Sequence, residues 1–408
     1  MRVLWLTAAA IAVTLPAYAD PLTYAGAIAL AEGTAPSLQA SVLQVDAARA
    51  IRHAAGRLPD PKLQLGIEGF PVSGPNAGRP GDEDFAAARV GVSQDLPNGA
   101  RRRAAVAGAV ADIGVAEAEV PVERRRLRVA TALAWIDLAY AERRLAALDQ
   151  LVGGLKGLWA AQPSSVASGA SRPAAGLEPK RLQAVFADRR SELVGAIAHA
   201  RAELTRWTGD PVPATSGDAA PYDIDPAALR SDLERHPSLL QKQAISRRAE
   251  AEVAAARAGR LPDWGVEASY ARRDPRFGDL LSAGVTVSLP LFPGSRQEPI
   301  VAARLADRNR IRAGIEDARR ALRAALDADL ADHAMHHEQW RRAVDILVPT
   351  AEQRSHLELS SYAAGRAGYD DVRQALTDLA DAKLTALERE ASVARDGARI
   401  ILTYGSDQ

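Results

Sequence analysis

The sequence contains the same six-residue element twice. AGRLPD occupies residues 55–60 and recurs at residues 258–263. Further short matches lie around the two copies in the same order: residues 36–38 with 237–239, and residues 204–209 with 402–405. Landmarks that recur in one order predict a duplicated fold. We therefore expect a first repeat at residues 20–209 and a second at residues 229–408, joined by a linker at residues 210–228 that is rich in Pro, Gly, Asp and Ala.

Each repeat also contains two runs in which apolar and polar residues alternate. The proline of AGRLPD ends a helical stretch, and the alternating runs follow it. They predict strands at residues 62–70, 86–96, 264–272 and 281–291, each with one apolar and one polar face. Two interpretations remain open here. The hairpins form a half-buried sheet packed on helices, or they cross a bilayer with the apolar face against lipid.

The stretches that follow the hairpins are compatible with very long helices, at about residues 98–160 and 296–356. Roughly 60 residues make a helix about 90 Å long, which is too long to lie across a four-stranded sheet. Apolar positions spaced alternately three and four apart predict coiled-coil stripes. The stripe residues are Leu138, Ala141, Leu145, Leu148, Val152, Leu155 and Trp159, and then Leu326, Leu330, His333, His337, Trp340, Val344 and Leu347. The predicted fold class is mostly α with a small β part, as a duplicated unit of helical hairpin and β-hairpin.

The first 19 residues have the pattern of a signal peptide. Arg2 precedes an apolar run at residues 3–15, and Ala17-Tyr18-Ala19 is the small-x-small sequence that a signal peptidase reads. We expect cleavage before Asp20 and export of the mature chain. Past Asp20 no stretch of about 18 uncharged apolar residues occurs, so any membrane crossing would not use helices.

Composition excludes several classes of function. Lysine plus arginine and aspartate plus glutamate each number 51, which leaves no net charge to hold a nucleic acid. There is no cysteine, which excludes thiolate metal sites, disulfides, cysteine nucleophiles and a lipid anchor on cysteine. No nucleophile elbow, phosphate loop, HExxH or dinucleotide fingerprint occurs. The sequence therefore predicts a protein that is not an enzyme and that has no cofactor.

Four membrane strands per chain are too few for a barrel. The smallest closed barrels have about eight strands, and open sheet edges are not tolerated in hydrocarbon. If the strands face lipid, several copies must share one barrel. Geometry alone leaves two, three or more copies open.

One stretch of the second repeat resembles a known family. It comprises Leu347-Val348-Pro349, residues 357–365 (LELSSYAAG), and Asp371-Val372 ahead of Ala375. These residues resemble the helix tip of the outer-membrane efflux (TolC-like) family, in particular its heavy-metal and multidrug efflux channel branch. The counterpart at residues 166–184 is weaker, and Gly169 and Gly176 are both candidates for its turn glycine.

The resemblance covers nearly the whole mature chain and implies an assembly. It implies a homotrimer in the bacterial outer membrane, in contact with lipid, with a twelve-stranded barrel and a helical tunnel that extends into the periplasm. It also implies two protein partners: a periplasmic adaptor (membrane fusion) protein and an inner-membrane pump, of the resistance-nodulation-division type. The implied function is a passive exit duct, for cargoes that could include metal cations.

The resemblance also assigns roles at the second tip. Asp370 and Asp371 open the returning helix, where a carboxylate complements the helix N-terminus whatever its other role. By resemblance, Asp371 faces the axis and three copies form an acidic constriction at the periplasmic entrance. Tyr362 matches a residue that helps to close this entrance, and Gly365 belongs to the tight turn.

Two positions depart from the family pattern at this tip. Gln374 stands where a second acidic residue is often found. Lys180 stands where an acidic residue of the first repeat would pair with the tyrosine. The network that closes the entrance in the family is therefore weakened in this sequence.

Histidines in the second repeat allow two interpretations. His333 and His337 are four residues apart and share one helical face, so with His336 and Met335 they could bind a soft or borderline cation. His333 and His337 also lie in the predicted coiled-coil stripe with Trp340, where packing against a partner helix would account for their positions. We favour packing, because a channel does not need a tight site that would retain its cargo.

The alternative function is a soluble periplasmic coiled-coil adaptor or scaffold protein. Such a protein would use its helical hairpins to hold partners. It predicts compact β-rich modules flanking one helical hairpin, whereas this chain has two copies of hairpin and long helix.

Overall fold

The computed structural model describes residues 21–169, 173–219 and 222–405, so the predicted signal peptide lies outside the described residues. The chain is mostly helical with one four-stranded antiparallel sheet, which confirms the predicted fold class. It forms two compact units. The helical unit contains residues 21–36, 124–230 and 325–405, and the sheet unit contains residues 37–123 and 231–324. Each unit thus takes segments from both predicted repeats.

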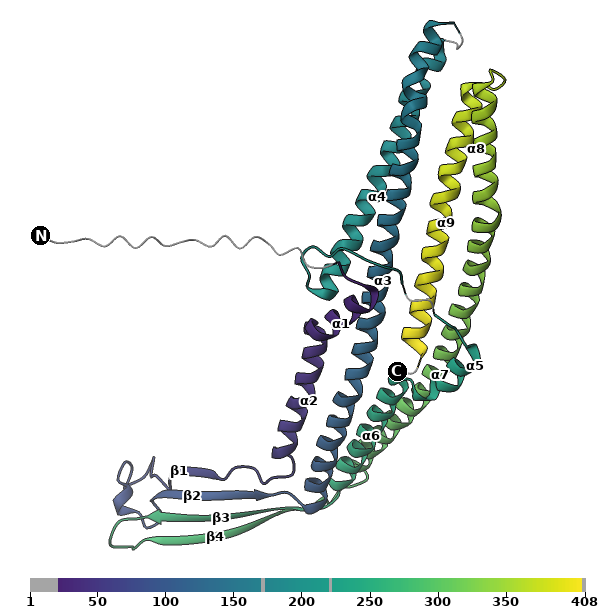
Figure 1. Ribbon diagram of the computed structural model, residues 1–408. Helices are drawn as coiled ribbons and strands as arrows, with labels where there is room; N and C mark the ends of the chain where they lie inside the picture. Colours follow the sequence, from purple (N-terminus) through teal and green to yellow (C-terminus); the bar gives the residue numbers. More distant parts are fainter. Residues whose placement is uncertain (1–20, 170–172, 220–221, 406–408) are drawn as a thin grey trace, which may run out of the picture. The chain divides into compact units, whose positions relative to one another are not determined.

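The sheet consists of β1 (Lys62–Glu68), β2 (Ala87–Leu96), β3 (Asp263–Arg272) and β4 (Leu280–Ser288), in that spatial order (Figure 1). β1 ends two residues before the predicted end because Gly69 adopts a φ of +65°, where an added Cβ would lie 2.6 Å from the Phe85 carbonyl oxygen. The central β2–β3 ladder joins the two halves of the chain.

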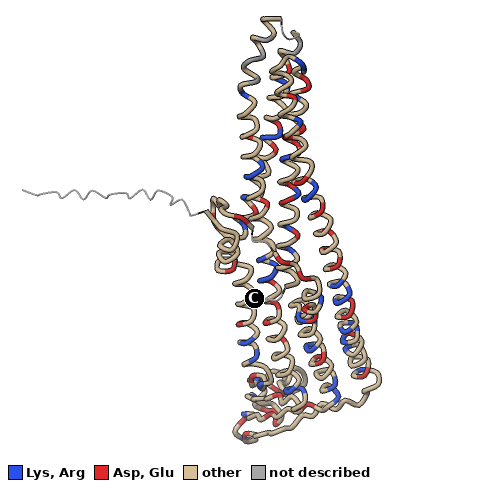
Figure 2. Tube along the Cα trace, turned by 45° about the vertical axis from the view of Figure 1, so that its right-hand side comes forward, with Lys and Arg blue, Asp and Glu red and all other residues tan. Residues whose placement is uncertain are grey.

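Four helical segments of the sheet unit lie next to one another. They are α2 (Pro36–Ala54), the first part of α3 (Gly99–Ala167), α6 (Pro237–Ala258) and the first part of α7 (Gln297–Arg342). Ion pairs join each to the next: Arg49 to Glu117 at 2.8 Å, Arg248 to Asp112, and Arg312 to Glu250 at 2.7 Å. Figure 2 shows charges of both signs along these helices. The helices therefore follow the same order as the strands.

The helical unit contains two helical hairpins. The first is the later part of α3 with α4 (Glu178–Thr208), and the second runs from the later part of α7 through α8 (Val348–Ala363) to α9 (Tyr369–Tyr404). Two short helices, α1 (Tyr24–Thr34) and α5 (Pro226–Asp232), complete the unit. Short 3₁₀ turns lie at Pro80–Asp82, Pro173–Gly176 and Leu233–Arg235.

The predicted stripe on α3 forms the core of the helical unit. Leu138, Leu148 and Leu155 are all buried, and they belong to two apolar clusters that draw on α3, α4 and α9. Trp135 is fully buried beside them and donates its Nε1–H to the Leu22 carbonyl oxygen at 2.8 Å. The 3–4 spacing thus identified a real packing surface.

The predicted stripe on α7 is only partly buried. Leu326 is fully buried, but Val344 and Leu347 are 43% and 44% exposed. The chain forms a π-helical segment at Ala343–Leu347, in which the Val348 N–H donates to the Ala343 carbonyl. Pro349 follows and has no N–H to continue the α-helical pattern. The extra residue of the π segment shifts the helical phase, so the second stripe does not continue as one buried seam.

Candidate functional site

The four strands present most of their large apolar side chains on one face of the sheet, and Leu280 lies on the other face. Directly opposed residues of an antiparallel sheet share a face, and the register pairs Leu65 with Val90, Val90 with Tyr270, and Val266 with Val285. The apolar face comprises Leu63, Leu65, Ile67, Val90, Val92, Trp264, Val266, Tyr270, Leu281, Val285 and Val287. Leu65 is 74% exposed and Leu281 is 83% exposed. An exposed apolar surface of this extent marks a contact with lipid or with another chain.

The opposite face of the sheet is polar and carries small residues. Each strand contributes one glycine to it, namely Gly66, Gly91, Gly265 and Gly284, and serine or threonine residues lie between them. Lys62 pairs with Asp95 at 2.6 Å, and Arg89 pairs with Glu68 at 2.6 Å. Small and charged side chains bury little apolar area, so this face suits contact with water.

Both outer strands of the sheet have a free edge. β1 and β4 each pair with a single neighbour among the described residues, so the backbone N–H and C=O groups on their outer sides have no ladder partner there. Unpaired edge groups favour the addition of another strand.

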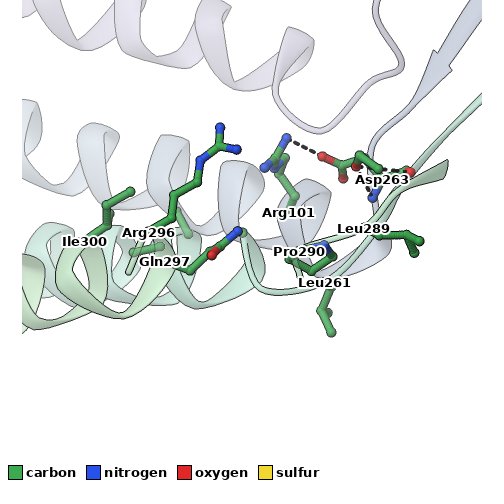
Figure 3. A pocket seen from close by; sticks show the side chains of 12 residues that line it. Arg101, Leu261, Asp263, Leu289, Pro290, Arg296, Gln297 and Ile300 are labelled. Atoms are coloured by element: carbon green, nitrogen blue, oxygen red, sulfur yellow. Dashed lines mark hydrogen bonds and ion pairs between the residues drawn. The ribbon is translucent and has the colours of Figure 1, made fainter. Parts of the chain in front are cut away.

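A polar cluster fixes the start of β3 to the start of α3. Asp263 accepts hydrogen bonds at 2.8 Å from the Asn98 backbone N–H and from Asn98 Nδ2. It also pairs with Arg101 at 2.5 Å (Figure 3). Asp263 and Arg101 border a pocket of about 470 Å³, which Arg296 also lines. The two AGRLPD copies differ here, because Gly56 has a φ of +74° whereas Gly259 is right-handed.

The tip of the second hairpin places its predicted residues close together. Gly365 has a φ of +69° and makes the turn between α8 and α9. Asp371 accepts a hydrogen bond from the Gly368 N–H at 2.9 Å, so its carboxylate caps α9. Asp370 is exposed and lies 3.6 Å from Arg373. The capping role accounts for the position of Asp371 in the chain and leaves its charge exposed to solvent.

Two tyrosines meet beneath this turn. Tyr362 and Tyr369 pack edge to face with ring centroids 6.5 Å apart, and Tyr362 contacts an apolar cluster shared with α3 and α4. The Tyr369 hydroxyl is buried without a hydrogen-bond partner among the described residues. Burial raises the pKa of Tyr369 above its ordinary value, and the neighbouring Tyr362 adds to the shift.

The two tips are joined by an ion pair that the sequence did not predict. Glu178, at the start of α4, lies 3.8 Å from Arg373 on α9. Lys180, the residue predicted at the tip, is exposed two positions later. At the first tip Gly169 has a φ of +75°, whereas Gly176 has no positive φ. Farther along the two hairpins, Arg395 pairs with Asp137 at 2.8 Å, and Arg189 pairs with Asp381.

The histidines of α7 pack against neighbouring rings. The rings of His333 and His337 lie 6.2 Å apart, and His337 contacts Trp340 edge to face at 5.5 Å. Burial lowers the pKa of His333. His336 instead contacts the buried Asp396, with Nδ1 2.6 Å from Oδ2. In the described part of the chain, no group of three or more His, Asp or Glu side chains is arranged to hold a metal ion.

Within the residues that the structure describes, no helix has both the length and the apolar character needed to cross a membrane.

The chain is similar to proteins of known family and structure. Residues 228–406 match the family model described as outer membrane efflux protein. A search of curated proteins gives no match. Among solved structures, the Campylobacter jejuni CmeC outer membrane channel has a TM-score of 0.79 at 13% identity, covering 94% of this chain and 85% of that chain. CusC, described in terms of folding and transmembrane channel formation, has a TM-score of 0.78 at 14% identity. The match covers 94% of this chain and 92% of that chain.

A third similar structure is the open state of the Neisseria gonorrhoeae MtrE outer membrane channel. Its TM-score is 0.74 at 15% identity, covering 94% of this chain and 89% of that chain. Identities this low establish a common fold, and the family match adds the relationship in sequence. The second half of the chain is thus similar in sequence to the outer membrane efflux protein family, and most of the chain is similar in fold to these outer-membrane channels.

Proposed function

We propose that the protein is the outer-membrane channel of a tripartite efflux system. It serves as a passive exit duct for substrates that a periplasmic adaptor and an inner-membrane pump deliver. The observation that supports this most directly is the sheet with one exposed apolar face and two free edges. Hydrocarbon is a favourable environment for such a face, provided that every edge is paired.

A ring of three copies would place the apolar face against lipid and pair both free edges of every sheet. If β4 of each copy pairs with β1 of the next, the four strands of each chain contribute to one twelve-stranded barrel. An eight-stranded barrel is filled by its own side chains, and a larger one leaves a water-filled interior. The glycines and serines of the polar face would line that interior and keep it wide.

The remaining parts of the proposal rest on the likeness to the outer membrane efflux protein family. Channels of this family are transporters and not enzymes. We propose that the helical unit extends into the periplasm and docks on a membrane fusion adaptor, and that the pump is of the resistance-nodulation-division type. The heavy-metal branch and metal cations as cargo are proposed on the acidic residues of the second tip, Asp370 and Asp371.

The state of the purified mature protein tests the channel proposal. In detergent we expect a homotrimer by light scattering, resistant to denaturant until it is heated, which forms discrete conductance steps in a planar bilayer. Removal of detergent should cause aggregation through the apolar sheet face. A monodisperse single copy that is stable without detergent would contradict the channel and support the alternative, a soluble periplasmic scaffold.

The scaffold function is less well supported by the sheet. A soluble protein would cover the apolar face of its sheet with another part of the chain. Leu65 and Leu281 instead remain largely exposed. The alternative would therefore need a separate protein to cover this face.

Loss of the Glu178–Arg373 ion pair should favour the open tip. A surface ion pair contributes about 0.5 kcal/mol, so loss in three copies should shift the ratio of closed to open tips by roughly tenfold. We expect Glu178→Gln to raise the mean conductance of single channels. Glu192→Gln, on the same helix and without an ion-pair partner in the described structure, is the matched control. Equal conductance for both variants would show that the Glu178–Arg373 ion pair does not help to keep the entrance closed.

A further inference from the structure

One charge on the polar face of the sheet is not balanced. Lys62 is held by Asp95, Arg89 by Glu68, and Asp263 by Arg101. Glu267 is the remaining charged residue on this face of the four described strands, and its carboxylate has no ion-pair or hydrogen-bond partner among the described residues. The polar face of each copy therefore carries one uncompensated negative charge.

The sheet register explains why Glu267 stays free. Glu267 lies opposite Ser93 on β2 and opposite Gly284 on β4. Lys62 is in the same row but two strands away, where Asp95 holds it. Neither direct neighbour of Glu267 carries a charge that could neutralise it.

A glycine makes room for the glutamate side chain. A Cβ built on Gly284 would lie 2.8 Å from Glu267 Oε1 and 3.1 Å from its Cγ. The side chain thus lies across β4 in the space that Gly284 leaves. It borders a groove of about 510 Å³ on the polar face, together with Gln64, Ser93 and Thr286. The carboxylate is held against the wall and remains in contact with solvent.

We propose that Glu267 is a selectivity-determining residue that gives the barrel interior a preference for cations. This inference rests on the proposed function, since it needs the polar face to line the lumen. Three copies of Glu267 would then form a ring at one height of the barrel, in the sheet unit and separate from the acidic residues of the helix tip. A ring of fixed carboxylates concentrates cations and disfavours anions in the water beside it.

The strength of this effect depends on salt. The screening length is about 10 Å at 0.1 M salt and about 3 Å at 1 M. A carboxylate on the wall of a wide barrel therefore acts on much of the lumen at low salt and only on the layer next to the wall at high salt. The preference due to Glu267 should be clear at 0.1 M and largely absent at 1 M.

The test measures reversal potentials of single channels under a KCl gradient. With Glu267→Gln we expect the ratio of potassium to chloride permeability to fall by about twofold at 0.1 M and to change little at 1 M. Glu267→Asp keeps the charge and should retain most of the wild-type ratio. Glu267→Lys should lower the ratio further than Glu267→Gln does. The measurements are repeated in an Asp371→Asn background, so that the charge at the tip cannot mask the change.

Asp84→Asn is the control, because it removes one carboxylate from the sheet unit at a position outside the strands. Asp84 lies in the connection between β1 and β2, beyond the strand ends, and should leave the ratio near the wild-type value. If wild-type protein forms channels and Glu267→Gln leaves their permeability ratio unchanged at 0.1 M, the inference is wrong while the channel function stands. If wild-type protein forms no channels, the proposed function itself fails.

Discussion

Leu65→Arg is expected to prevent insertion of the protein into membranes. Leu65 lies on the apolar face of β1 and is largely exposed to whatever medium covers the sheet. An arginine on the lipid-facing side of a transmembrane strand costs about 2–4 kcal/mol at the bilayer midplane. Each copy in the proposed ring would contribute this cost, so the assembled barrel should be lost almost completely.

Gln64→Arg is the matched control for this change. Gln64 is the adjacent residue of the same strand and lies on the polar face. Here the arginine would meet water, so insertion should be retained. The measurement is the amount of heat-modifiable trimer in the washed membrane fraction and in lipid vesicles. Equal insertion of the two variants would show that the apolar face does not meet lipid.

Asp371→Asn is expected to weaken block by divalent cations and to raise single-channel conductance. The carboxylate of Asp371 both caps α9 and, in the proposed assembly, adds charge to the entrance. An asparagine retains an oxygen that can accept the Gly368 N–H, but it removes the charge. With three charges removed from one constriction, we expect block by divalent cations to weaken by about tenfold.

Two further variants separate the charge of Asp371 from its capping role. Asp371→Glu keeps the charge and should keep the block. Asp371→Ala removes the cap as well as the charge, at about 1 kcal/mol of helix stability. It should lower the thermal stability of the tip in addition to weakening the block. Persistence of wild-type block in Asp371→Asn would exclude this residue from the entrance.

The faces of the sheet could be predicted from the sequence because alternation depends only on neighbouring residues. Leu63, Leu65 and Ile67 share a face whatever their partners are. The exact strand ends depend on contacts distant in sequence, as Gly69 shows by its close approach to Phe85. The stripe on α3 was predicted for the same local reason as the sheet faces.

Features that depend on tertiary packing could not be predicted from the spacing of residues in the sequence. The π segment before Pro349 changes the helical phase. The alternating spacing of three and four residues assumes an unbroken α-helix, so it cannot predict this change. The ion pair between Glu178 and Arg373 joins two helices that are distant in sequence, so no local spacing could predict it. The roles of Asp371, Asp370, Tyr362 and Gly365 at an entrance stay predictions until conductance is measured.

The two free edges of the sheet belong to different halves of the chain. β1 comes from the first half and β4 from the second, so each junction of the proposed ring joins unlike surfaces, head to tail. A copy with a damaged β4 still offers an intact β1 to its neighbour. It would enter a growing assembly and stop it from closing. Such defective copies should therefore be dominant over intact copies made in the same cell, and a minority of them would inactivate most of the assemblies.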